Sequence, residues 1–123
     1  MKKLIVFILL VLNFSFLNAQ TYQEWVHKAD SCSRAKNYKL CVSYYSKAFK
    51  IEKKSFVDFN HAGCSAAMAK ENKKAFKWLN LSIDKGYENI SHIQIDPDLT
   101  SLHSEKEWKK TIDKLQKKVD AIG

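Results

Sequence analysis

The two residues best suited to chemistry are His61 and Cys64, which lie three positions apart in a segment where apolar residues recur at helical spacing. Residues with this separation share one face of a helix, so the imidazole is within reach of the thiol. A thiolate beside a general base is the arrangement of a thiol-dependent enzyme or a redox protein. Nothing in the sequence identifies an orienting group or an oxyanion site, so we expect no catalytic residue. A thiol enzyme or redox protein that uses Cys64 and His61 is the alternative interpretation.

The remaining chemistry-bearing residues form no familiar ligand pattern. None of the histidines falls into a CxxC, HxxxH or HExxH arrangement; they are His27, His61, His92 and His103. The chain also has no glycine-rich phosphate loop and no Gly-x-Ser-x-Gly elbow. The sequence therefore predicts neither a metal site nor a cofactor.

The N-terminal segment has the layout of a secretory signal peptide. Lys2 and Lys3 precede nine consecutive apolar residues at 4–12, and Ala19 offers a small residue for cleavage before Gln20. The apolar run is shorter than the roughly 20 residues that span a bilayer. We therefore expect 1–19 to be a cleaved signal peptide and the protein to be periplasmic or secreted. An uncleaved anchor is the alternative, and no other segment is expected to span a membrane.

Length and charge restrict the class of protein and partner. The chain has 123 residues and a net charge of +8, and the part that follows the signal peptide, 20–123, is long enough for one domain. A basic surface attracts acidic proteins, anionic surfaces or nucleic acid. Export argues against nucleic acid, so the expected partner is a protein or peptide, and most lysines are expected to form a solvated face.

Apolar residues recur at helical spacing through nearly all of 20–123, and no segment shows the sustained alternation of a strand. The sequence therefore predicts an all-α fold. The expected helices cover 22–36, 38–53, 56–70, 72–85 and 105–119.

Capping signals support these boundaries. Asn37 and Asn72 are placed to cap the second and fourth helices, and Gly86 is placed to end the fourth. Two further helix-start signals lie in the C-terminal segment; they are Asp96-Pro97 and the capping-box pattern of Ser104 with Glu107.

The turn between the first two predicted helices is expected to bring two cysteines face to face. Cys32 lies near the end of the first predicted helix and Cys41 near the start of the second. An exported chain meets an oxidising compartment, so a Cys32–Cys41 disulfide is one alternative and free thiols are the other. Cys64 is the odd cysteine in the first case.

The sequence is self-similar at a spacing of 34 residues. Large residues align with large ones and small with small; the pairs include Trp25 with Phe59, Ala29 with Gly63, Cys41 with Ala75 and Tyr45 with Leu79. This period and size pattern resembles the tetratricopeptide repeat, in which an aromatic and a small residue on one helix are followed by a small and a large residue on the next. Cys41 takes the small slot, which indicates a packing role.

The resemblance implies a short right-handed solenoid of two helical hairpins. Repeat one would cover 22–55, repeat two 56–89, and a C-terminal cap 90–120. In the cap, Trp108, Ile112 and Leu115 are expected to pack on the second repeat, assisted by Ile93, Ile95 and Leu99. Within 37–51, the expected packing stripe is Leu40, Tyr44, Ala48 and Ile51, widened by Cys41 and Tyr45.

The resemblance also implies a function. The first helix of each hairpin lines a concave face that binds a peptide or a partner helix without catalysis. On that face the residues would be Gln23, Val26, Asp30, Arg34, Asn60, Cys64 and Met68. A structural envelope component that self-assembles through an uncovered repeat face is a further alternative.

Overall fold

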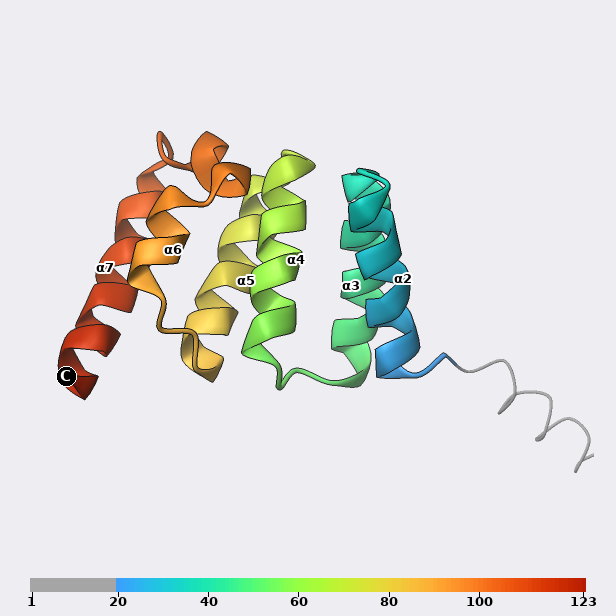
Figure 1. Ribbon diagram of the computed structural model, residues 1–123, viewed down its shortest axis with the longest axis horizontal. Coiled ribbons are helices and arrows are strands. Elements are labelled where there is room, and N and C mark those ends of the chain that lie inside the picture. Colours follow the sequence, from blue (N-terminus) through green and yellow to red (C-terminus); the bar gives the residue numbers. More distant parts are fainter. Residues whose placement is uncertain (1–19) are drawn as a thin grey trace, which may run out of the picture.

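The computed structural model describes residues 20–123, and every regular element in them is a helix (Figure 1). The elements are α2 (Tyr22–Arg34), α3 (Tyr38–Ile51), α4 (Phe56–Met68), α5 (Asn72–Lys85), α6 (Ile90–Ile95), the 3-10 helix η1 (Pro97–Leu102) and α7 (Lys106–Ile122). The predicted all-α class is confirmed for this part of the chain. The expected signal peptide at 1–19 lies outside the described residues. None of the described helices combines the length and the apolar character that crossing a bilayer requires.

Helix boundaries recur along the chain at a fixed spacing. One set of helices begins at Tyr22, Phe56 and Ile90 and the other at Tyr38, Asn72 and Lys106, each start 34 residues after the previous one in its set. The residues before the first set also correspond, because the side chains of Thr21, Ser55 and Asn89 each accept a hydrogen bond from the backbone N–H three positions on. The C-terminal segment, expected to be a cap, therefore starts as a third unit whose first helix is broken between α6 and η1.

The turns inside the first two units also match. Lys36 and Lys70 have φ angles of 60° and 61°, a left-handed conformation that ends α2 and α4. Each turn is closed by a backbone hydrogen bond of 2.9 Å, from Asn37 N–H to Cys32 O and from Glu71 N–H to Ala66 O. Because the backbone closes these turns, the next helices begin without a side-chain cap.

Three of the expected helix caps are wrong. Asn37 precedes α3 but its side chain makes no capping hydrogen bond, and Asn72 is the first residue of α5. The Ser104 capping box is also wrong, because α7 begins after Glu105 with no side-chain cap. The other two signals behave as expected: Gly86 ends α5 at a φ of 129°, and the Asp96 side chain accepts from Asp98 N–H at the start of η1.

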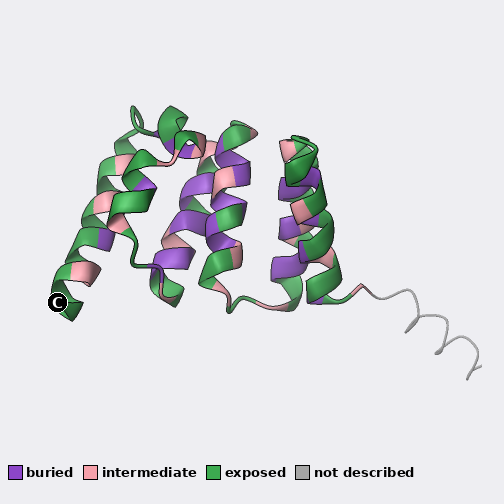
Figure 2. Ribbon diagram, viewed as in Figure 1, coloured by how far each residue is buried: buried purple, intermediate pink, exposed green. Residues whose placement is uncertain are grey.

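Helix α4 lies at the centre of the fold, between α3, α5 and η1 (Figures 1 and 2). Its buried residues are mostly small, so neighbouring helices approach closely. Phe59 meets Phe49 of α3 with ring centroids 4.3 Å apart. On the other side, a Cβ placed on Gly63 would lie 2.8 Å from the Leu79 side chain of α5. Gly63 therefore sets the closest distance between α4 and α5.

The buried face of α3 is rotated from the expected stripe. Cys41, Tyr45 and Ala48 are buried as predicted, but Leu40 and Ile51 are 38% and 54% exposed. Val42 and Phe49 are buried in their place. The reason is that α3 packs against both α2 and α4, so its buried face lies between the two contacts.

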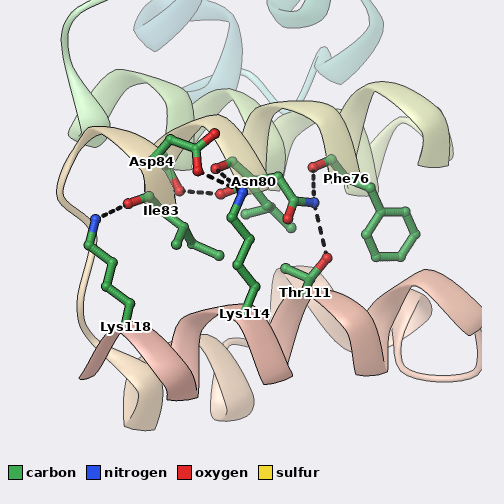
Figure 3. A network of polar contacts seen from close by, with 9 residues as sticks. Phe76, Asn80, Ile83, Asp84, Thr111, Lys114 and Lys118 are labelled. Atoms are coloured by element: carbon green, nitrogen blue, oxygen red, sulfur yellow. Dashed lines mark hydrogen bonds and ion pairs between the residues drawn. The ribbon is translucent and has the colours of Figure 1, made fainter. Parts of the chain in front are cut away.

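Helix α7 covers α5 through one buried leucine and a set of polar contacts (Figure 3). Leu115 is fully buried. The Asn80 amide donates to Phe76 O at 2.7 Å and to Thr111 Oγ1 at 3.1 Å. Lys114 forms an ion pair of 2.6 Å with Asp84, and Lys118 donates to the Ile83 carbonyl oxygen near the end of α5.

The expected hydrophobic cap is therefore correct in part. Leu115, Ile93 and Leu99 are fully buried, and Ile112 packs at the edge of the core. Trp108 is only half-buried, with its ring 4.4 Å from that of His103. Ile95 is 77% exposed because α6 ends there and the chain turns away at Asp96.

We predict that Gly63→Ala destabilises the protein, although alanine normally favours a helix more than glycine does. The new methyl group would overlap the side chain of Leu79, which is fully buried, so the free energy of unfolding should fall by about 1–3 kcal/mol. Urea denaturation followed by circular dichroism measures this. The control is Ser43→Ala on the exposed side of α3. A Gly63→Ala protein as stable as the parent would contradict the close approach.

We also predict that Leu115→Ala lowers the free energy of unfolding by about 2–5 kcal/mol, since it removes a fully buried side chain from the α5–α7 contact. Trp108→Ala should cost less, because its ring is half-buried. Thermal melts of the two variants, with exposed Ile122→Ala as control, test the order. A larger loss for Trp108→Ala than for Leu115→Ala would show that the docking contact is misplaced.

Candidate functional site

The face formed by α2, α4 and the α6–η1 segment is hollowed into a groove of about 430 Å³. Two residues of α3 complete its wall. The lining residues are Asp30, Ser33 and Arg34 of α2; Tyr38 and Tyr45 of α3; Asn60, His61, Cys64 and Ser65 of α4; and His92, Asp96 and Asp98 of the α6–η1 segment. The groove thus combines side chains from the first helix of each of the three units.

Four of the seven expected binding residues line this groove: Asp30, Arg34, Asn60 and Cys64. The other three lie elsewhere. Val26 is buried in the core, whereas Gln23 and Met68 are exposed at the first turn of α2 and the last residue of α4. The structure therefore gathers the middle and the C-terminal part of α2 with the middle of α4.

Asp30 is held in place by a tyrosine from the neighbouring helix. The Tyr45 hydroxyl donates a hydrogen bond of 3.0 Å to Asp30 Oδ1. Burial, followed by the charge of Asp30, raises the pKa of Tyr45, so this hydroxyl keeps its proton at neutral pH. A second bond of the same type, 2.6 Å from the Tyr22 hydroxyl to Asp58 Oδ2, ties α2 to the start of α4. The first bond joins α3 to α2 and the second joins α2 to α4, so together they hold α2 against both neighbouring helices.

At the other end of the groove, a thiol, an imidazole and two carboxylates lie together. Cys64 Sγ is 3.5 Å from Asp96 Oδ2, and His92 Nε2 is 3.4 Å from the same oxygen. Donor atoms of Cys64, Asp96 and Asp98 all lie within 4.8 Å of one another. Burial, followed by the charge of Asp96, raises the pKa of both the Cys64 thiol and the Asp98 carboxyl.

The alternative of a thiol enzyme gains no support from this geometry. His61 lines the groove, but the hydrogen-bond partner of the Cys64 thiol is the Asp96 carboxylate. A raised pKa leaves Cys64 largely as the thiol at neutral pH, whereas the thiolate is the nucleophile.

The other two cysteines are buried next to each other as free thiols. Burial raises the pKa of the Cys41 thiol to about 11, and the neighbouring Cys32 adds to the shift. Their proximity agrees with the expected hairpin turn. The Cys32–Cys41 disulfide remains a prediction.

Sequence reasoning missed His92, Asp96 and Asp98 as groove residues. Asp96-Pro97 was a visible helix-start signal, and it did place a carboxylate at the beginning of η1. Its orientation toward Cys64 depends on the packing of η1 against α4. No local sequence pattern predicts this contact, because η1 and α4 are about thirty residues apart in the chain.

Comparison of the chain with known protein families, curated proteins and solved structures found no match.

We predict slow alkylation of Cys64 by iodoacetamide at neutral pH in the folded protein. Its raised pKa keeps the fraction of thiolate small, and its partial burial restricts access of the reagent. Peptide mass spectrometry after timed labelling measures the rate, with the same protein unfolded in urea as the reference. The rate should keep rising with pH beyond the ordinary cysteine pKa of about 8.5. Labelling of folded Cys64 faster than in urea would instead indicate an activated thiol.

Proposed function

We propose that this protein is a non-catalytic binding module that holds a peptide, or a segment of another protein, in the groove lined by Asp30, Arg34, Asn60 and Cys64. The finer fold belongs to the same proposal: helical hairpins of the tetratricopeptide type, stacked as a short right-handed solenoid whose concave face is this groove. The observation that carries it is the lining of one groove by the first helix of each successive unit.

Support for the repeat organisation comes from backbone detail. Helix starts, N-terminal caps and left-handed turn residues recur at the same spacing of 34 residues. A common template for successive helix pairs is the property that lets such pairs stack with a constant rotation and form an extended concave surface. Both aromatic residues contact α3, Trp25 through Tyr44 and Phe59 through Phe49, but Trp25 is half-buried and Phe59 fully buried.

Support for peptide binding comes from the mixed chemistry of the lining. Asp30 and Arg34 present opposite charges on successive turns of α2, and Asn60 presents an amide from α4. Such groups can pair with the backbone and with charged side chains of an extended segment. We propose further that the protein is exported, so that its partner is an envelope or extracellular protein.

The test starts with capture of partners from an envelope extract on the immobilised protein, with identification by mass spectrometry. Overlapping synthetic peptides of a captured protein are then titrated, and fluorescence anisotropy gives the Kd of the segment that binds. Arg34→Ala combined with Asn60→Ala should weaken that peptide at least about tenfold, a loss of about 1.4 kcal/mol. Circular dichroism establishes that the double variant is folded.

A matched control uses the lysine-lined groove between α3 and α5, which contains Lys50 and Lys74. Lys50→Ala combined with Lys74→Ala should leave the Kd unchanged. If the Asn60 and Arg34 variant binds the peptide as tightly as the parent, the proposed groove is not the binding surface.

A further inference from the structure

We propose that Cys64, His92, Asp96 and Asp98 form a binding site for a divalent transition-metal ion, with Zn²⁺ as the natural occupant. The sequence predicted no metal site, because the residues follow no ligand motif. The proposal does not depend on peptide binding, and its test uses the metal alone.

Two separations of the donor atoms, both measured from Asp96, match those of a tetrahedral zinc site. Zinc lies about 2.3 Å from a thiolate sulfur and about 2.0–2.1 Å from a nitrogen or oxygen ligand, so tetrahedral angles place sulfur about 3.6 Å from an oxygen ligand and nitrogen about 3.3 Å from it. The structure has 3.5 Å between Cys64 Sγ and Asp96 Oδ2, and 3.4 Å between His92 Nε2 and that oxygen. The donors that already lie within 4.8 Å of one another are those of Cys64, Asp96 and Asp98, so an ion would bind among them, and the exposed His92 side chain would join it by a change of rotamer.

A backbone hydrogen bond orients the carboxylate of Asp96 for this role. Its Oδ1 atom accepts a hydrogen bond of 2.9 Å from the backbone N–H of Asp98, which leaves Oδ2 to face the thiol and the imidazole. Ligating carboxylates and imidazoles are commonly fixed by such outer contacts. The start of η1 thus presents the central ligand on a rigid backbone, and Asp98 brings a second carboxylate within 4.8 Å of Cys64 and Asp96.

The charges around the cluster also call for a cation. Among the described ion pairs, Asp96 is paired with His92 alone, and Asp98 belongs to none of them. The backbone hydrogen bond from Asp98 to Asp96 holds the two carboxylates on one turn, so their negative charges lie close together beside the thiol. A divalent ion would neutralise both carboxylates at once.

The kind of donors selects the metal. Thiolate and imidazole ligands favour Zn²⁺ or a similar transition metal over Mg²⁺ and Ca²⁺, which prefer oxygen ligands only. The cluster lines the open groove, so a metal ion can reach it from solvent.

Co²⁺ is the probe for the test, since it reports both tetrahedral geometry and thiolate ligation in its absorption spectrum. The full-length protein, as isolated from cells, is freed of metal with a chelator and then titrated with Co²⁺. We expect one Co²⁺ per chain with a thiolate-to-cobalt charge-transfer band, and full displacement by Zn²⁺. Cys64→Ser should abolish that band. His92→Gln and Asp96→Asn should each weaken Zn²⁺ at least about tenfold in competition with a chromophoric chelator.

Matched control variants distinguish binding at this site from non-specific metal binding elsewhere on the protein. Asp96→Asn keeps an oxygen that can cap η1, and circular dichroism checks that every variant is folded. Cys32→Ser and His27→Gln alter a cysteine and a histidine outside the groove and should leave the spectrum and the affinity unchanged. The proposal is overturned if no charge-transfer band forms, if the band survives in Cys64→Ser, or if His92→Gln and Asp96→Asn bind Zn²⁺ as the parent does.

Discussion

The close approach of α4 to its neighbours is the constraint on which the rest of the structure depends. Most of α4 is buried, and an apolar helix of this kind is stable only when other elements cover it. Its small residues let α5 approach at Gly63 and let α3 place Phe49 against Phe59. With α3 and α5 fixed in this way, η1 covers the remaining side of α4 and brings Asp96 to Cys64.

The same geometry relates the core to the groove. The apolar residues of α4 face α3 and α5, while Asn60 and Cys64 line the groove between α2 and η1. Hydrogen bonds from buried tyrosines hold the opposite wall, since the Tyr45 hydroxyl fixes Asp30 on α2. A groove with rigid walls suits binding, because a ligand then loses little energy in ordering its receptor. Peptide recognition and metal binding are both compatible with this rigidity.

Much of the fold could be predicted from sequence because its signals are local. Hydrophobic spacing placed the first four helices, and Gly86 correctly ended α5. The buried face of α3 was mispredicted because two helices cover it, and only tertiary packing reveals both. The recurrence of the 34-residue spacing at Ile90 and Lys106 was not predicted, because the segment between these two helix starts is broken at Asp96-Pro97.

Less of the candidate site was predictable. Asp30, Arg34, Asn60 and Cys64 could be assigned to one face because each lies on a regular helix with known spacing. His92, Asp96 and Asp98 belong to short, irregular helices, so their direction depends on contacts between distant parts of the chain. The hydrogen bond from Tyr45 to Asp30 joins residues of two helices, so no local sequence pattern could predict it either.

The order of the packed elements has a consequence for the way this chain acquires its structure. In the described residues, α2 packs on α3, α3 on α4 and α4 on α5, and the C-terminal elements extend no further back than α4 for their main contacts. Such a topology has a low contact order, which is associated with fast folding. Helix pairs can therefore assemble in sequence while later parts of the polypeptide are still being synthesised.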